Sequence, residues 1–159
     1  MKTTYSFRSV RRPVASKKLL HRAMYDAAAA AGLPVAGDWE FKVWFLDDEA
    51  MAEAHVDIMD VPGTTDVITM AYLEEPEALF PGDMGLELLV CVPFAEREGA
   101  EREDSSFADE LMLYIVHGCL HAAGINDLEE ADRQIMRRRE AEVMALLKEK
   151  YTFSEIFPS

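Results

Sequence analysis

The chain has few cysteines, no long apolar run and a shortage of basic residues, and each shortage narrows the class of protein. Only two cysteines occur in 159 residues, and both Cys91 and Cys119 lie inside apolar stretches. We therefore expect buried thiols rather than a disulfide framework. No stretch approaches the roughly 20 apolar residues that a membrane span needs, and the polar N-terminus has no secretory signal core. These absences predict a soluble cytoplasmic protein with no membrane contact.

Acidic residues outnumber basic ones, 30 against 16, and give a formal net charge of −14 at pH 7. Such a balance disfavours nonspecific binding of nucleic acid over the whole surface. A local basic patch remains compatible with RNA, and few acids interrupt the cluster near the N-terminus. Arg8, Arg11 and Arg12 are therefore candidate RNA contacts. The later run 137–139 either contacts phosphates or pairs with neighbouring glutamates along a helix, and we favour the pairing.

The pattern of apolar residues predicts one domain, residues 1–159, in which strands and helices are mixed. We expect it to be a compact α+β domain with a small mixed β-sheet packed with helices and a central metal-binding helix. The expected strands are 4–10, 39–45, 66–72 and 86–92, the expected helices are 17–31, 47–58, 94–102, 107–123 and 129–150, and 74–83 is expected to be a loop.

The end of the central helix carries two histidines four residues apart, His117 and His121. This spacing puts both imidazoles on one helix face, close enough to bind one metal ion. Gly124 can end the helix in a left-handed conformation, so the chain can bring Asp127 back toward the histidines. Two histidines, one carboxylate and an open position are typical of a catalytic zinc site. The alternatives are two histidines packed without metal, and a helix-capping role for Asp127.

The same spacing occurs in the zinc-protease helix H-E-x-x-H-x-x-G-x-x-H. The two histidines and Gly124 fall in register, and Asp127 takes the place of the third ligand. Gly118, however, stands where the proteases keep the glutamate that serves as general base. Because glycine cannot take up a proton, the pattern favours a metal-dependent hydrolase that is not an ordinary metalloprotease.

Three motifs together resemble the YbeY family of bacterial rRNA maturation factors. The stretch HGCLHAAGIND (117–127) resembles H-G-x-L-H-x-x-G-x-D-H, and TDVITM (65–70) resembles T-D-V-[IL]-[ST]-F. A strand at 86–91 corresponds to a third hallmark, G-[DE]-I-x-[IV]-[SC]. The motifs occur in the family's order and cover most of the chain.

The resemblance implies a metal-dependent, single-strand-specific endoribonuclease that acts in rRNA maturation, at the 3′ end of 16S rRNA, and in ribosome quality control. It implies one Zn²⁺ held by His117, His121 and Asp127, with His117 as the catalytic residue. Since Asp127 replaces the family's third histidine, another divalent metal could occupy the site. The nucleophile is either water or the RNA's own 2′-hydroxyl.

Other positions in the family motifs suggest further site residues. Asp66 or Glu87 could orient a ligating histidine, although Asp66 could instead anchor a turn. The family's arginine falls at about Met59 and its asparagine at about His55, so His55 either lines the metal cleft or faces solvent.

Two other functions remain open from the sequence. The chain could be a ribosome-assembly factor with a mainly structural metal, which the replacement of the family arginine by Met59 favours. It could also be a zinc hydrolase of a small substrate. The resemblance implies single-stranded RNA or rRNA, the small ribosomal subunit and its assembly factors as partners.

Overall fold

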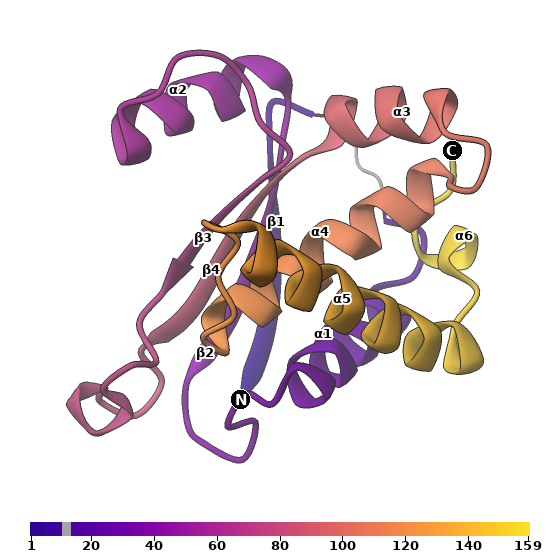
Figure 1. Ribbon diagram of the computed structural model, residues 1–159. Coiled ribbons are helices and arrows are strands. Elements are labelled where there is room, and N and C mark those ends of the chain that lie inside the picture. Colours follow the sequence, from indigo (N-terminus) through magenta and orange to yellow (C-terminus); the bar gives the residue numbers. More distant parts are fainter. Residues whose placement is uncertain (11–13) are drawn as a thin grey trace.

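A four-stranded mixed sheet organises the fold in the computed structural model, which describes residues 1–10 and 14–159 (Figure 1). The strand order is β1-β2-β4-β3. Strands β1, β2 and β4 run parallel to one another, and the edge strand β3 pairs antiparallel with β4. The strands are β1 Lys2–Arg8, β2 Glu40–Leu46, β3 Val67–Ala71 and β4 Met84–Cys91. The predicted α+β class with a small mixed sheet is confirmed.

Helices pack on both faces of this sheet, but unequally. Alternate strand residues such as Phe41, Val43 and Leu88 point to one face of the sheet, where they form the main core together with the helices that cover this face. The other face has a smaller apolar cluster beneath α2, which lies across the sheet from α1 and α5 (Figure 1). The helices are α1 Lys17–Ala31, α2 Asp48–Met59, α3 Val92–Glu101, α4 Phe107–Ala122, α5 Glu130–Lys150 and α6 Phe153–Ile156, with a 3₁₀ turn η1 at Pro76–Ala78.

Helix α4 is the central helix predicted from the sequence, and it approaches the sheet closely at Gly118. It contacts strands β3 and β4 as well as helices α1 and α5. A Cβ atom built on Gly118 would lie 2.3 Å from Cδ2 of Leu88 and 2.7 Å from its Cδ1. Glycine is therefore needed here for packing. Position 118, where zinc proteases have their catalytic glutamate, faces the core of this protein and not the histidine side of the helix.

Some element boundaries differ from the prediction for local reasons. The first strand runs from Lys2 to Arg8 instead of 4–10. It starts earlier because Lys2 already pairs with Glu40 of β2, and it ends at Arg8 because Ser9 adopts a left-handed conformation with φ of 57°. Helix α6 was not predicted, because its four residues are too few to show a helical period; Phe153 and Ile156 are nevertheless buried.

Two further expectations concern the thiols and the membrane. Cys91 and Cys119 are both free and buried, as predicted. Within the described ranges, no helix combines the length and the apolar character needed to cross a membrane.

Candidate metal centre

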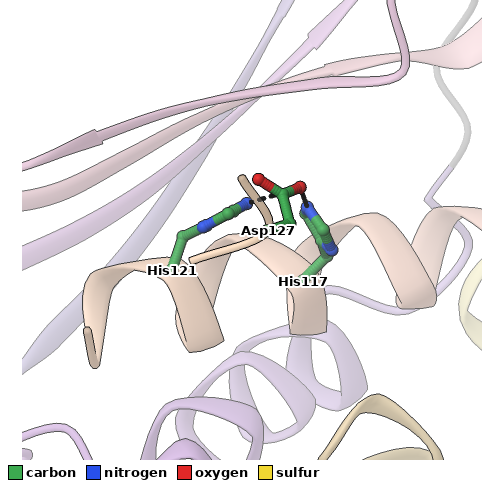
Figure 2. A group of neighbouring side chains, drawn as sticks. All are labelled: His117, His121 and Asp127. Atoms are coloured by element: carbon green, nitrogen blue, oxygen red, sulfur yellow. Dashed lines mark ion pairs between the residues drawn. The ribbon is translucent and has the colours of Figure 1, made fainter. Parts of the chain in front are cut away.

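His117 and His121 lie on the last turns of α4 and face the same side. Their ring centroids are 4.4 Å apart with an interplanar angle of 87°. Both side chains are partly exposed, at 23% and 25%. Figure 2 shows that both rings point toward Asp127. The Oδ2 atom of Asp127 lies 3.8 Å from Nε2 of His117 and 3.5 Å from Nε2 of His121.

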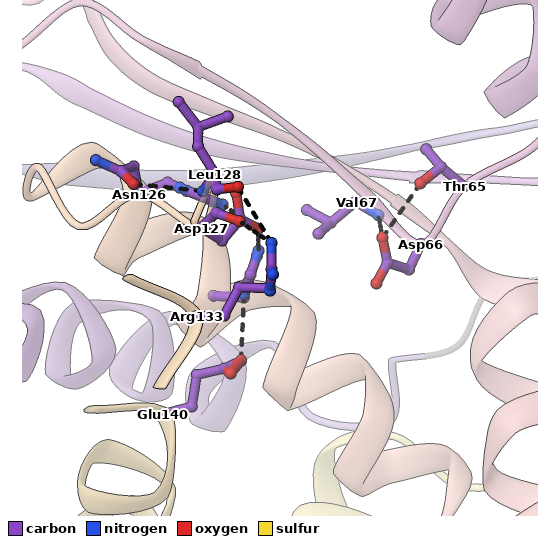
Figure 3. A network of polar contacts seen from close by, with 10 residues as sticks. Thr65, Asp66, Val67, Asn126, Asp127, Leu128, Arg133 and Glu140 are labelled. Atoms are coloured by element: carbon purple, nitrogen blue, oxygen red, sulfur yellow. Dashed lines mark hydrogen bonds and ion pairs between the residues drawn. The ribbon is translucent and has the colours of Figure 1, made fainter. Parts of the chain in front are cut away.

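The loop after α4 brings Asp127 into this position. Gly124 has φ of 99°, and its backbone N–H donates to the carbonyl of His121, so the helix ends and the chain reverses. Nη1 of Arg133 donates to the backbone carbonyls of Asp127 and Leu128 at 3.4 and 3.1 Å (Figure 3). The N-cap residue of α5 is Glu129. Asp127 is therefore not the N-cap of α5, and its carboxylate faces the histidines.

The three side chains fit a divalent metal ion. Their ligand atoms all lie within 4.8 Å of one another. A tetrahedral ion with ligand distances of about 2.0–2.2 Å separates two ligand atoms by about 3.3–3.6 Å. The two Nε2–Oδ2 distances, 3.5 and 3.8 Å, are close to this separation and too long for good hydrogen bonds. The arrangement matches two imidazoles and one carboxylate around a common ion.

The other ring nitrogen of His117 contacts a carboxylate from α5. Nδ1 of His117 lies 3.2 Å from Oε2 of Glu140. Burial of the ring acts to lower the pKa of His117, but the hydrogen bond and charge of Glu140, together with Asp66 and Asp127, outweigh it and raise the pKa above its usual value. The sequence offered no signal for Glu140, because the contact depends on how α4 and α5 pack together.

A cleft of about 490 Å³ opens over the three candidate ligands. Its other walls come from strand β3, from the segment before it and from helix α2. His55, Met59, Thr65 and Asp66 all line it. Among the described residues, its lining includes neither lysine nor arginine. The cleft is thus wide enough for a ligand, but its charged groups near the metal position are carboxylates.

Asp66 is both a structural residue and a wall of the cleft. Its Oδ1 accepts hydrogen bonds from the backbone N–H of Val67 at 2.7 Å and from the Thr65 hydroxyl at 3.3 Å (Figure 3). Its backbone carbonyl accepts from the N–H of Cys91. These contacts fix the entry into β3, which agrees with the turn-anchoring alternative.

His55 and Met59 project from α2 into the same cleft. Nδ1 of His55 lies 2.8 Å from the carbonyl oxygen of Gly63, so this nitrogen is engaged within the chain. Met59 is 54% exposed and places a thioether where the family's arginine is expected.

Two predicted site residues lie elsewhere. Glu87 accepts a hydrogen bond from Nε1 of Trp44 at 2.7 Å, on the sheet face that α2 covers. Arg8 lines the same small cavity as Glu87 and Trp44 and lies 3.9 Å from Glu53. The structure brings neither Glu87 nor Arg8 to the three ligands, so the proposed histidine-orienting role of Glu87 is not supported. Arg11 and Arg12 lie outside the described residues.

The basic run on α5 is partly paired within the chain. Nη1 of Arg139 bonds to Glu142, and its Nη2 donates to the carbonyl of Ala30. Arg137 lies 3.9 Å from Glu130. These contacts agree with the helical-pairing alternative.

Taken together, the mixed sheet and the His–His–Asp cluster define an α+β protein with a candidate site for a single metal ion. Residues 7–148 match the family described as endoribonuclease YbeY. The chain therefore belongs to the YbeY family, and the resemblance seen in the sequence is confirmed. The family's name also agrees with the predicted class of enzyme, an endoribonuclease.

Individual relatives give the same result. The chain is 33% identical over 138 residues to endoribonuclease YbeY of Thermobifida fusca, which covers 84% of this chain and 86% of that protein. It is 39% identical over 101 residues to the Micrococcus luteus endoribonuclease YbeY, covering 61% of this chain and 63% of that protein. The solution structure of a Thermotoga maritima protein has the same fold, with a TM-score of 0.59, 19% identity, and coverage of 92% and 91% of the two chains.

Proposed function

We propose that this protein is a metal-dependent endoribonuclease that cuts single-stranded RNA during rRNA maturation, with the 3′ end of 16S rRNA as its target, and that it acts in ribosome quality control. The observation that carries the proposal is the convergence of His117, His121 and Asp127 on one point of an open cleft. Membership of a family named for endoribonuclease activity supports it.

Zinc is the metal that this ligand set suits best, because two imidazoles and a carboxylate with an open position are typical of catalytic zinc. The carboxylate of Asp127 also leaves room for a harder divalent ion. When bound, the ion supplies Lewis acidity that polarises a phosphoryl oxygen of the RNA. His117, the residue predicted to be catalytic, would hold the ion from α4 together with His121, and Asp127 would close the site from the following loop.

The rest of the RNA must find its cationic contacts outside the lining of the cleft, because the described lining residues include no lysine or arginine. Arg11 and Arg12 stay candidates for this role, whereas Arg8 would reach only RNA that extends to the other sheet face. The nucleophile stays open between water and the RNA's 2′-hydroxyl. We place the reaction in the cytoplasm, on the small ribosomal subunit or with its assembly factors, because that is where immature 16S rRNA occurs.

The direct test is cleavage of a labelled single-stranded RNA that spans the 3′ end of 16S rRNA, with zinc present, by the native protein and by a His121→Ala variant. The same RNA annealed to its complement controls for strand specificity. We expect the native protein to cut the single strand, and the variant to cut neither RNA. Equal cleavage by both proteins would contradict the proposal, because the activity would not depend on the metal ligands.

A second function, ribosome assembly with a mainly structural metal, is favoured by Met59 and by the absence of lysine and arginine from the described lining of the cleft. It makes a different prediction in the same experiment. The native protein and the His121→Ala variant would both fail to cut RNA, the native protein would still hold zinc, and it would bind small-subunit particles.

A further inference from the structure

Glu140 occupies a defined place behind the candidate metal site. It lies in the middle of the 21-residue helix α5, and its side chain is only 16% exposed. Its Oε2 atom lies 3.2 Å from Nδ1 of His117, while Nε2 of the same ring faces Asp127 (Figure 2). The imidazole of His117 is thus held between two carboxylates from different parts of the chain.

This arrangement selects one form of the His117 ring. A neutral imidazole carries its proton on one nitrogen and a free lone pair on the other. The carboxylate of Glu140 accepts a hydrogen bond, so it favours the form in which Nδ1 carries the proton. The lone pair of Nε2 then points toward Asp127 and the position of the ion. His121 has no matching carboxylate on its own Nδ1 within the described part of the chain.

We propose that Glu140 is the positioning residue of the metal site, which orients His117 and fixes its tautomer for metal binding. The proposal rests on the metal site of the proposed function. Ligating histidines commonly donate their second N–H to such a carboxylate, and its loss typically costs about 10–100-fold in metal affinity. Of the carboxylates that could play this part, Asp66 bonds to Val67 and Glu87 bonds to Trp44. Among the described carboxylates, Glu140 is the one that contacts a ligand nitrogen on the side away from the ion.

The test is zinc affinity, measured by competition with a chromophoric chelator, for the native protein, Glu140→Ala, Glu140→Gln and Glu142→Ala. Glu142 is the matched control, since it lies two residues further along α5 and pairs with Arg139 instead of His117. We expect Glu140→Ala to bind zinc about 10–100-fold more weakly than the native protein. Glu140→Gln should lose less, because its amide oxygen can still accept from Nδ1. Glu142→Ala should bind like the native protein.

A second measurement separates orientation from a general loss of structure. Long-range ¹H–¹⁵N spectra of the metal-free protein, recorded with the ring neutral, report which nitrogen of His117 carries the proton. The native protein should show the Nδ1–H form, and Glu140→Ala a mixture of both forms in an otherwise unchanged spectrum. Native zinc affinity in Glu140→Ala, or a native tautomer there, would overturn the inference. Failure of the native protein to bind zinc would instead overturn the metal site of the proposed function.

Discussion

The two sides of helix α4 differ in their surroundings. One side packs against the sheet and α1; Leu111, Ile115 and Cys119 are fully buried there, and Gly118 lets the helix approach Leu88 closely. The other side presents His117 and His121, which are only partly buried, to an open cleft. A single helix thus contributes one side to the core and the other side to the candidate metal site. Substitutions on the core side should mainly change stability, and substitutions on the cleft side should mainly change zinc affinity.

The largest expected effect comes from the open side. His121→Ala removes one of three candidate ligands. Loss of a residue that only hydrogen-bonds to a ligand lowers metal affinity by about 10–100-fold, so we expect a larger fall in zinc affinity for His121→Ala. The unfolding free energy of the metal-free protein should change by only about 1 kcal/mol, because the ring is partly exposed and lies outside the apolar core. Chelator competition and urea unfolding measure the two quantities.

His55→Ala is the matched control for this prediction, since His55 lines the same cleft without joining the cluster. It should keep native zinc affinity. A metal site that survives His121→Ala but not His55→Ala would break the assignment of ligands.

A change on the closed side should act on stability instead. Gly118→Ala gains helix propensity of about 1 kcal/mol, but its methyl group meets Leu88 at 2.3 Å in a packed core. Overpacking of this kind costs about 1–3 kcal/mol, and so close a contact belongs in the upper half of that range. We expect a net loss of about 1–2 kcal/mol in urea unfolding of the metal-free protein.

A double-mutant cycle with Leu88→Ala sharpens this test. The alanine at Gly118 should cost less once the Leu88 side chain is shortened, because the two groups compete for the same space. If Gly118→Ala were as stable as the native protein, this would contradict the claim that α4 lies too close to Leu88 for a methyl group to fit.

The smallest expected effect is on the pH dependence of the unfolding free energy, and it comes from His117 on the cleft side of α4. The pKa of His117 is raised in the metal-free protein, despite the opposing effect of burial, by Glu140 and the nearby acids. A raised folded-state pKa adds stability that is full below the unfolded value of about 6.5 and is lost as the pH rises through the folded pKa. Native minus His117→Ala unfolding free energies should therefore fall with rising pH in this window. A difference that grows with pH would contradict the sign.

The sequence predicted the parts of the site that local geometry determines. His117 and His121 share a helix face because of their spacing, and Gly124 reverses the chain so that Asp127 can return. Glu140 could not be predicted, because its contact depends on the packing of α5 against α4. Glu87 was assigned from its place in a motif; in β4, however, Leu86 and Leu88 point into the main core, so the residue between them points to the other face.

The most direct test of the central claim is anomalous diffraction at the zinc absorption edge from crystals of the native protein grown with zinc. One strong peak should lie between Nε2 of His117, Nε2 of His121 and the carboxylate of Asp127, and it should be absent in His121→Ala crystals. If native crystals showed zinc only at other positions, or none at saturating zinc, the three residues would not form the metal centre of this protein.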